Sequence, residues 1–188
     1  MISQLQPALG RLLISEPFLL DPNFKRAVVL LTDQQPEGTM GFILNHRSAL
    51  LLKDLIPDMG DDADFPVYFG GPVETDTVHF IHRCYDQLNG GEEIGKGIYW
   101  GGNFETLKIL IQNKSIKAED IKFFLGYSGW AAGQLENEMK ENTWIVSDQY
   151  HADVVFSDNE ENLWREVIIN LGPKYAHVSN FPSDPNLN

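Results

Sequence analysis

Ser128, in the segment Gly126-Tyr127-Ser128-Gly129, is the strongest catalytic signal in the chain. The segment Gly126–Trp130 places a serine between a predicted strand and a predicted helix, as in the nucleophile elbow of α/β-hydrolases. That elbow needs a glycine at the second position after the serine, and Trp130 occupies this position. A serine nucleophile also needs a base, and the spacing favours neither His151 nor His177. We therefore interpret Ser128 as a capping hydroxyl at a tight strand-to-helix turn, and we assign no catalytic residue.

The side chains that bind metals show no converging pattern. His79 and His82 lie close to Cys84, but residues three apart on a strand point to opposite faces of a sheet. The acidic run from Asp58 to Asp64 lacks the alternating acids, central glycine and distal glutamate of a calcium loop. We expect neither a metal site nor a cofactor.

The elements that must position these residues are typical of an α+β domain. Apolar runs bounded by turn residues predict strands at residues 10–15, 27–32, 39–45, 67–69, 78–82, 98–100, 121–127, 144–146 and 154–156. Helices are predicted at residues 48–56, from a cap at 103, at 131–142 and at 157–171. Strands outnumber helices and do not alternate regularly with them, which favours α+β over a doubly wound fold.

Three local signals refine this picture. Residues 27–32 are so apolar that both faces of that strand should be buried. The turn at residues 35–38 is too short for a parallel crossover, so the flanking strands should form an antiparallel hairpin. Asp21 is a good N-cap and Pro22 suits the first helical position, which predicts one helical turn that caps the sheet.

Length and composition are those of one globular domain. The chain has 188 residues, of which 43% are hydrophobic and 22% charged. Cys84 is the lone cysteine, and the sequence has neither a signal peptide nor an apolar run of about 20 residues that would span a membrane. We expect a cytoplasmic protein with a single domain over residues 1–179. The polar segment 180–188 should be a mobile tail.

Four blocks of residues resemble the YqgE/AlgH family of bacterial proteins. They are Asp21-Pro22 with Phe24 and Arg26 ahead of the strand at 28–31, the segments Gly38–Asn45 and Val67–Val73, and the run Gly126–Glu138 followed by Asn142 and Trp144. The resemblance implies a single α+β domain with a mixed, largely antiparallel, bent or barrel-like sheet and three to four flanking helices. It implies no assigned reaction. Some members are labelled transcriptional regulators through an association with exopolysaccharide production.

This chain departs from the family pattern at three places. The family usually reads Asn-Arg-Pro where this chain has Asn45-His46-Arg47, so the arginine is shifted by one position. The family commonly has alanine at the position of Ser128, which weakens the interpretation of this serine as a nucleophile. The usual Gly-His-Ala ending is replaced by Ala176-His177 and a divergent tail.

The matched blocks contain polar and aromatic side chains that core packing alone would not select. Two interpretations are open: a polar network that locks the sheet, or a groove for a ligand or a protein partner. A buried amide needs several partners, so we predict that Gln134 and the edge of Trp130 line a partly open groove with Asp21 and Arg26. The complete set of predicted site residues is Asp21, Arg26, Asn45, Tyr127, Trp130, Gln134 and Glu138.

Two functions follow from these observations. The favoured one is a non-enzymatic regulatory or interaction protein, a transcriptional regulator that acts indirectly through a protein or small-molecule partner. The alternative is a hydrolase that uses Ser128 or a carboxylate in the same groove. A buried Ser128 would argue against the hydrolase, because a nucleophile must reach its substrate.

The charge of the chain predicts that it does not bind duplex DNA directly. The formal net charge is −13, and residues 1–94 carry 6 basic and 14 acidic side chains while residues 95–188 carry 8 and 13. Non-specific affinity for DNA comes largely from basic side chains that replace counterions along the phosphates. We expect no useful binding to a labelled duplex in an anisotropy titration at physiological salt. Sub-micromolar binding that weakens steeply with added salt would contradict this prediction.

Overall fold

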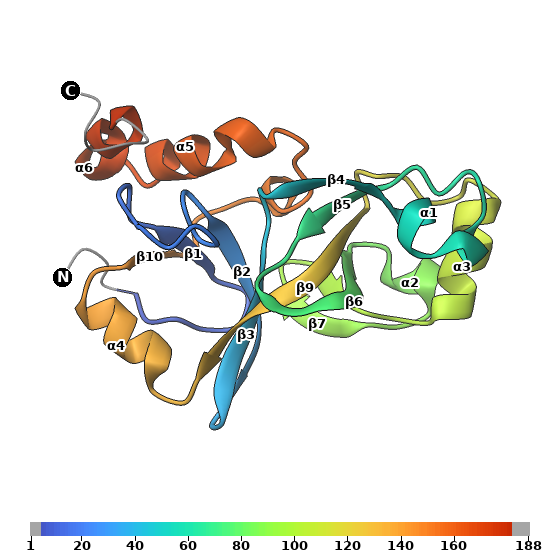
Figure 1. Ribbon diagram of the computed structural model, residues 1–188, viewed down its shortest axis with the longest axis horizontal. Coiled ribbons are helices and arrows are strands. Elements are labelled where there is room, and N and C mark those ends of the chain that lie inside the picture. The colour runs from blue at the N-terminus through green and yellow to red at the C-terminus, as the bar shows by residue number, and fades with distance from the viewer. Residues whose placement is uncertain (1–4, 182–188) are drawn as a thin grey trace.

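The computed structural model describes residues 5–181 and shows two lobes joined by one long strand (Figure 1). The strands are β1 (Leu12–Ser15), β2 (Val28–Gln35), β3 (Gly38–Ile43), β4 (Arg47–Leu51), β5 (Pro66–Phe69), β6 (Val73–His82), β7 (Glu92–Gly95), β8 (Ile98–Trp100), β9 (Ile121–Ala131) and β10 (Trp144–Ser147). The helices are α1 (Leu52–Leu55), α2 (Tyr85–Leu88), α3 (Phe104–Gln112), α4 (Gln134–Lys140), α5 (Glu160–Asn170) and α6 (Pro173–Ala176), with 3-10 turns at Pro57–Met59, Ala152–Val154 and His177–Asn180.

These strands form one bent sheet that does not close into a barrel. Their order is β10-β1-β2-β3-β9-β6-β8-β7, and β4 is attached at the side through β5, which pairs with β9. All the pairings are antiparallel except that of β5 with β9. Three helices within the described range are longer than four residues, namely α3, α4 and α5. The predicted single-domain α+β fold with a bent, largely antiparallel sheet is confirmed.

The first lobe contains β1–β3, β10 and α4–α6, and the second lobe contains β4–β8 and α1–α3. Strand β9 belongs to both lobes. Its first half pairs with β5 and β6, and its second half, from Ser128 to Ala131, pairs with β3. Gly126 lies between the two halves with a φ of 67°, a left-handed conformation that favours glycine. The strand therefore turns locally at Gly126 and passes from one half of the sheet to the other.

The chain crosses β9 at very close range directly after β5. A Cβ on Gly70 would lie 2.3 Å from the carbonyl oxygen of Gly126, so only glycine fits there. The Gly70 amide donates to the carbonyl of Leu125, and its own carbonyl accepts from the amide of Ile43 and the hydroxyl of Ser128, all at 2.9 Å. The crossing thus ties β3, β5 and β9 together.

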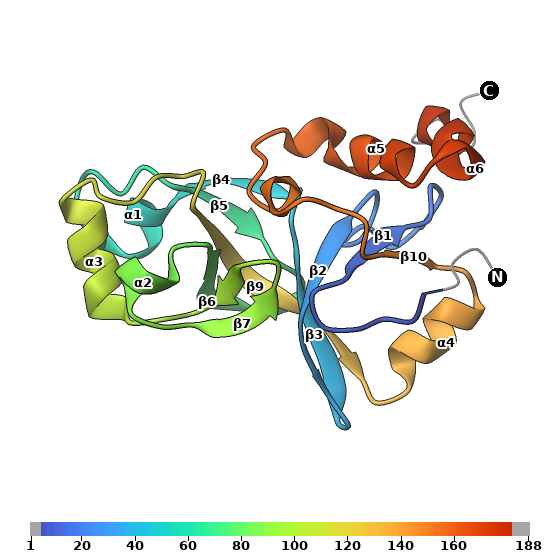
Figure 2. The same cartoon turned by 180° about the vertical axis from the view of Figure 1, so that it is seen from behind.

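The first lobe has a helix on each side of its strands (Figure 1 and Figure 2). Leu12, Ile14, Val28 and Leu30 belong to the core cluster that contains the buried face of α5. The alternate residues Leu13, Val29 and Leu31 belong to a second cluster that contains Leu135 and Met139 of α4. Because successive strand residues face opposite sides, β2 is buried on both faces, as its apolar sequence predicts.

The second lobe has a separate core cluster between its strands and helices α1 and α3. Helix α3 begins as predicted, with Asn103 Oδ1 accepting from the amide of Thr106 at 2.8 Å. Leu107 and Ile111 on the buried face of that helix share the cluster with Phe123 of β9. The predicted hairpin of β2 and β3 is likewise present.

Four local predictions were wrong. Strand β9 continues through Ser128 to Ala131, so this serine lies within a strand and caps no helix, and α4 begins only at Gln134. The predicted strand at 154–156 is a 3-10 turn at Ala152–Val154 followed by loop. The helix predicted at residues 48–56 is much shorter, because residues 48–51 belong to β4 and only Leu52–Leu55 are helical, as α1.

The fourth error concerns the start of α5. Asn159, not Ser157, is the N-cap residue, and the Ser157 hydroxyl accepts from the amide of Asn159 at 3.1 Å. The serine orders the turn that leads into the helix, which is a common alternative use of a short polar side chain.

The segment after α6 packs against the first lobe as far as it is described. The ring of Phe181 stacks on Phe18 with centroids 5.4 Å apart, and Asn180 Oδ1 accepts from Arg165 at 2.7 Å. Residues 182–188 of the predicted mobile tail lie outside the described residues. Over residues 5–181, the helices are too short and too polar to cross a membrane.

A buried lysine fastens the segment before α5 to the second lobe. Lys122 on β9 is 4% exposed, and its ammonium lies 4.0 Å from the ring centroid of Tyr68 on β5. Its Nζ donates to the carbonyl of Ser157 at 2.9 Å. Burial lowers the pKa of Lys122 to about 7, although the nearby carboxylates of Glu160 and Asp158 partly oppose the shift.

This lowered pKa predicts that stability rises between pH 7 and pH 10. In that range the unfolded lysine keeps its proton, while the folded one, with a pKa of about 7, has lost it. The unfolded state therefore binds more protons, and the free energy of unfolding increases with pH, by about 3 kcal/mol over the window.

Urea unfolding from pH 6.5 to pH 10 tests this expectation. A Lys122→Met chain should lose most of the rise, because methionine does not titrate. Equal slopes for the two chains would contradict the prediction.

Candidate functional site

Arg26 and Asn45 lie together at the loop that precedes β2. The side chain of Asn45 accepts from the amide of Val28 and donates to the carbonyl of Arg26, both at 2.9 Å. These bonds hold Arg26 with a φ of 50°, an unfavourable conformation for a residue with a Cβ. The Arg26 guanidinium lies 4.8 Å from the ring centroid of Trp164 on α5 and donates to the carbonyl of Phe181.

An open cleft of about 740 Å³ lies on one side of Arg26, and we call it the outer cleft. Its lining has three basic side chains, Lys25, Arg26 and Arg47, and two acidic ones, Glu160 and Glu161. Arg47 and Glu160 form an ion pair at 3.3 Å. The remaining lining residues are Pro22, Asn45, His46, Ser48 and Ala49.

The local charge of the outer cleft opposes that of the whole chain. Cations exceed carboxylates in its lining, whereas the net charge of the chain is −13. Burial lowers the pKa of His46, against the hydrogen bond between its ring and the carbonyl of Lys25, so this imidazole is neutral at pH 7. The cleft is therefore a place where an anionic partner meets favourable charge.

A smaller cavity of about 370 Å³ shares Arg26, Asn45 and Glu161 with the outer cleft, and we call it the inner cavity. Arg165 on α5 is the second cation in its lining. Burial lowers the pKa of Arg26, and the charge of Arg165 lowers it further. The other lining residues are Asn45, Glu161, Asn162, Trp164, Ser179, Asn180 and Phe181.

Trp130, Gln134 and Glu138 form a hydrogen-bonded network in the first lobe. Glu138 Oε2 accepts from the indole of Trp130 at 2.9 Å and from that of Trp144 at 2.7 Å. Glu138 Oε1 accepts from Gln134 Nε2 at 3.0 Å, and Gln134 Oε1 accepts from the amide of Ala131 at 3.1 Å. These hydrogen bonds join β9, α4 and β10.

Tyr127 and Asp21 lie elsewhere. Tyr127 lines a third cavity, of about 470 Å³, together with Trp130 and residues of β2 and β3. Asp21 is exposed and accepts from the amide of Asn23 at 2.9 Å, as a turn-capping residue does. The turn that begins at Asp21 contacts the network at one point, where the ring centroid of Phe24 lies 6.0 Å from that of Trp130.

The predicted site residues therefore form separate groups. Arg26 and Asn45 line the outer cleft and the inner cavity, whereas Trp130, Gln134 and Glu138 form the network. A single groove that joins Gln134 and Trp130 with Asp21 and Arg26 stays a prediction. Sequence reasoning missed Trp144 as the second indole, although it follows the matched block, and missed Arg165, which resembles any exposed helix cation.

Ser128 occupies a position where a nucleophile has no access to substrate. It is fully buried, and its hydroxyl donates to the carbonyl of Gly70 at the crossing over β9. The hydroxyl thus serves the fold, by satisfying a backbone carbonyl in the core.

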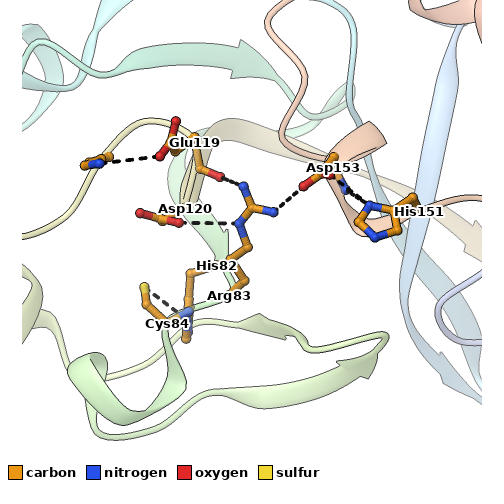
Figure 3. A network of polar contacts seen from close by, with 8 residues as sticks. His82, Arg83, Cys84, Glu119, Asp120, His151 and Asp153 are labelled. Atoms are coloured by element: carbon orange, nitrogen blue, oxygen red, sulfur yellow. Dashed lines mark hydrogen bonds and ion pairs between the residues drawn. The ribbon is translucent and has the colours of Figure 1, made fainter.

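Cys84 and its neighbours form a structural cluster at the end of β6 (Figure 3). The thiol lies 3.7 Å from Nδ1 of His82, but burial, followed by the charge of Asp120, raises the pKa of Cys84 to about 11. The thiol is therefore protonated at pH 7 and a poor nucleophile. His79 lies apart from this pair, with its ring against Phe42 and Tyr127.

Arg83 connects the same cluster to the segment that leads into α5 (Figure 3). Its guanidinium pairs with Asp120 at 3.4 Å and with Asp153 in the 3-10 turn, and it lies over the ring of Phe156. Within residues 5–181, no group of three or more His, Cys, Asp or Glu side chains is arranged to hold a metal ion.

The network predicts that Glu138→Gln lowers stability. An amide in place of the carboxylate either turns its NH₂ toward the two indole N–H donors, or keeps its oxygen there and loses the bond from the exposed Gln134 amide. In both orientations the two indole bonds lose the charge of the carboxylate that strengthens them. We expect a loss of about 2 kcal/mol in the free energy of unfolding. Glu136 is exposed on the same helix, and Glu136→Gln should change stability by less than about 0.5 kcal/mol.

Urea titrations followed by tryptophan fluorescence measure both variants, and they also report the environment of the two indoles. Equal stability of the two variants would show that the carboxylate does not hold the network.

Comparison with known proteins identifies the family. Residues 12–176 match the family model described as AlgH-like. A UPF0301 protein of Chlorobaculum tepidum is 42% identical over 179 residues, covering 95% of each chain, and one of Bacteroides fragilis is 41% identical over 187 residues, covering 99% of this chain and 94% of the relative.

Solved structures agree with this match. The AlgH protein of Pseudomonas aeruginosa has a TM-score of 0.71 at 26% identity, covering 96% of this chain and 98% of that one. Protein DIP2367 of Corynebacterium diphtheriae shares the fold, with a TM-score of 0.78 at 21% identity over 95% of both chains. The chain therefore belongs to the AlgH-like family. This is the YqgE/AlgH family that its sequence motifs resemble.

Proposed function

We propose that this chain is a non-enzymatic regulatory or interaction protein of the cytoplasm that acts by binding a partner in the outer cleft. The observation that carries the proposal is the excess of cations in this cleft, in a chain whose net charge is −13. The partner is a protein segment that presents acidic side chains. A regulatory effect on transcription would then be indirect, because a net charge of −13 opposes the binding of duplex phosphates.

The shape of the cleft supports a protein segment as the occupant. The cleft is open and larger than the inner cavity, and its walls come from the loop at Pro22–Arg26, the start of β4 and the start of α5. Lys25 and Arg47 contribute cationic ends at this surface, and complementary charge of this kind gives an interface its specificity.

The hydrolase alternative has less support. Ser128 is buried and bonded to backbone, so it would need a rearrangement of the core to reach a substrate. Glu138, the carboxylate of the predicted groove, accepts from two indoles and an amide, so it has a structural partner on each oxygen. Ser128 therefore lacks the access to substrate that a nucleophile requires, and Glu138 has no oxygen free of a structural hydrogen bond.

Neutralising the cleft tests this function. A double variant, Lys25→Gln with Arg47→Gln, removes two cations from the outer cleft. The matched control, Lys117→Gln with Lys140→Gln, removes the same charge from exposed positions outside its lining. Each chain is immobilised and used to capture proteins from the native lysate, and the captured proteins are quantified by mass spectrometry.

We expect a protein that the wild type and the control retain equally and that the cleft variant retains about tenfold less. Thermal melting of the three chains must coincide, so that the loss reports binding and not unfolding. Identical capture profiles for the three chains would refute the outer cleft as the binding surface.

A further inference from the structure

Two arginines share the inner cavity without a carboxylate partner. The charge of Arg165 acts on Arg26 across the cavity, yet neither guanidinium forms an ion pair within residues 5–181. Arg165 donates to the neutral side chain of Asn180, and Arg26 donates to a backbone carbonyl. Glu161 also lines the cavity but forms an ion pair with neither arginine, so the two cations exceed the one carboxylate there.

Arg26 also has an unused donor at this position. Its Nε is buried and has no hydrogen-bond partner, and a buried donor without a partner is costly. The backbone of Arg26 is held in an unfavourable conformation by the side chain of Asn45. Strain and an unsatisfied donor on one residue are typical of a side chain positioned for a ligand.

We propose that the inner cavity binds the phosphate group of a small molecule between Arg26 and Arg165. A phosphate monoester carries a charge of about −1.5 to −2 at pH 7, which matches two guanidiniums, whereas a single carboxylate matches only one. The planar fork of arginine binds phosphate through two parallel N–H bonds. A cavity of about 370 Å³ lies within the size range of small-ligand sites.

This inference goes beyond the proposed function, because it concerns a second ligand in a different cavity. Arg26 lines both cavities, but Arg165 lines only the inner one and Arg47 only the outer one. Variants at these two arginines therefore separate the two proposals, and the failure of one leaves the other standing.

An NMR titration with inorganic phosphate at constant ionic strength tests the site. The ring of Trp164 lies under the Arg26 guanidinium, so its indole resonance should shift in a saturable manner. The indoles of Trp130 and Trp144, which bond to Glu138 in the network, provide an internal control and should not move. Acetate should bind about tenfold more weakly than phosphate, because it carries one charge and not two.

Three variants complete the test. Arg165→Gln should weaken phosphate binding about tenfold, while Arg47→Gln, which removes the same charge from the neighbouring cleft, should change it less than about twofold. Glu161→Gln removes a carboxylate from the cavity wall and should strengthen binding, a gain that misfolding does not produce.

Three results would overturn the proposal. They are a titration without saturation, an equal effect of Arg47→Gln and Arg165→Gln, and acetate binding as tight as that of phosphate. The first would mean that no site exists, the second that only the diffuse charge of this face matters, and the third that the cavity recognises a single negative charge.

Discussion

The close crossing of two backbones at Gly70 and Gly126 is the constraint on which both lobes depend. Because a Cβ at Gly70 would lie 2.3 Å from the Gly126 carbonyl, the chain leaving β5 passes β9 with no side chain between them. That approach lets the Gly70 carbonyl accept from both Ile43 and Ser128, so strands of the two lobes share one bonded centre. The serine that resembles a nucleophile in the sequence is thus one of the donors that hold the crossing.

A second set of contacts fastens the segment before and within α5, and basic side chains make it. Arg83 holds Asp153 and lies over Phe156, Lys122 donates to Ser157, Arg47 pairs with Glu160, and Arg26 lies over Trp164. Each basic side chain comes from the sheet or its loops, and each partner lies between residues 153 and 164. An acidic chain has few basic side chains, and four of them are used along this one seam. The cationic lining of the outer cleft and the inner cavity follows from that use.

The sequence predicts the elements whose signals are local, and it fails where contacts between distant residues decide. The apolar run at 27–32 predicts a strand buried on both faces, and α4 and α5 cover those faces. The glycines at 126 and 129 instead suggest a turn after residue 127, because a lone sequence does not show that Gly126 must meet Gly70. Likewise, Trp130, Gln134 and Glu138 can be singled out from their types, but the second indole comes from Trp144 on another strand. Arg165 carries no signal at all, since an exposed arginine on a helix is ordinary.

The net charge limits how an anion reaches this seam. At physiological salt the Debye length is about 8 Å, so an anion feels the acidic surface only at short range and the local cations only within the cavities. Long-range steering therefore contributes little, and the affinity must come from direct charge-assisted hydrogen bonds to fixed donors. Arg26, held by Asn45 and by the face of Trp164, is fixed before any ligand arrives. Such preorganisation reduces the entropy cost of binding, which makes selective recognition compatible with an acidic protein.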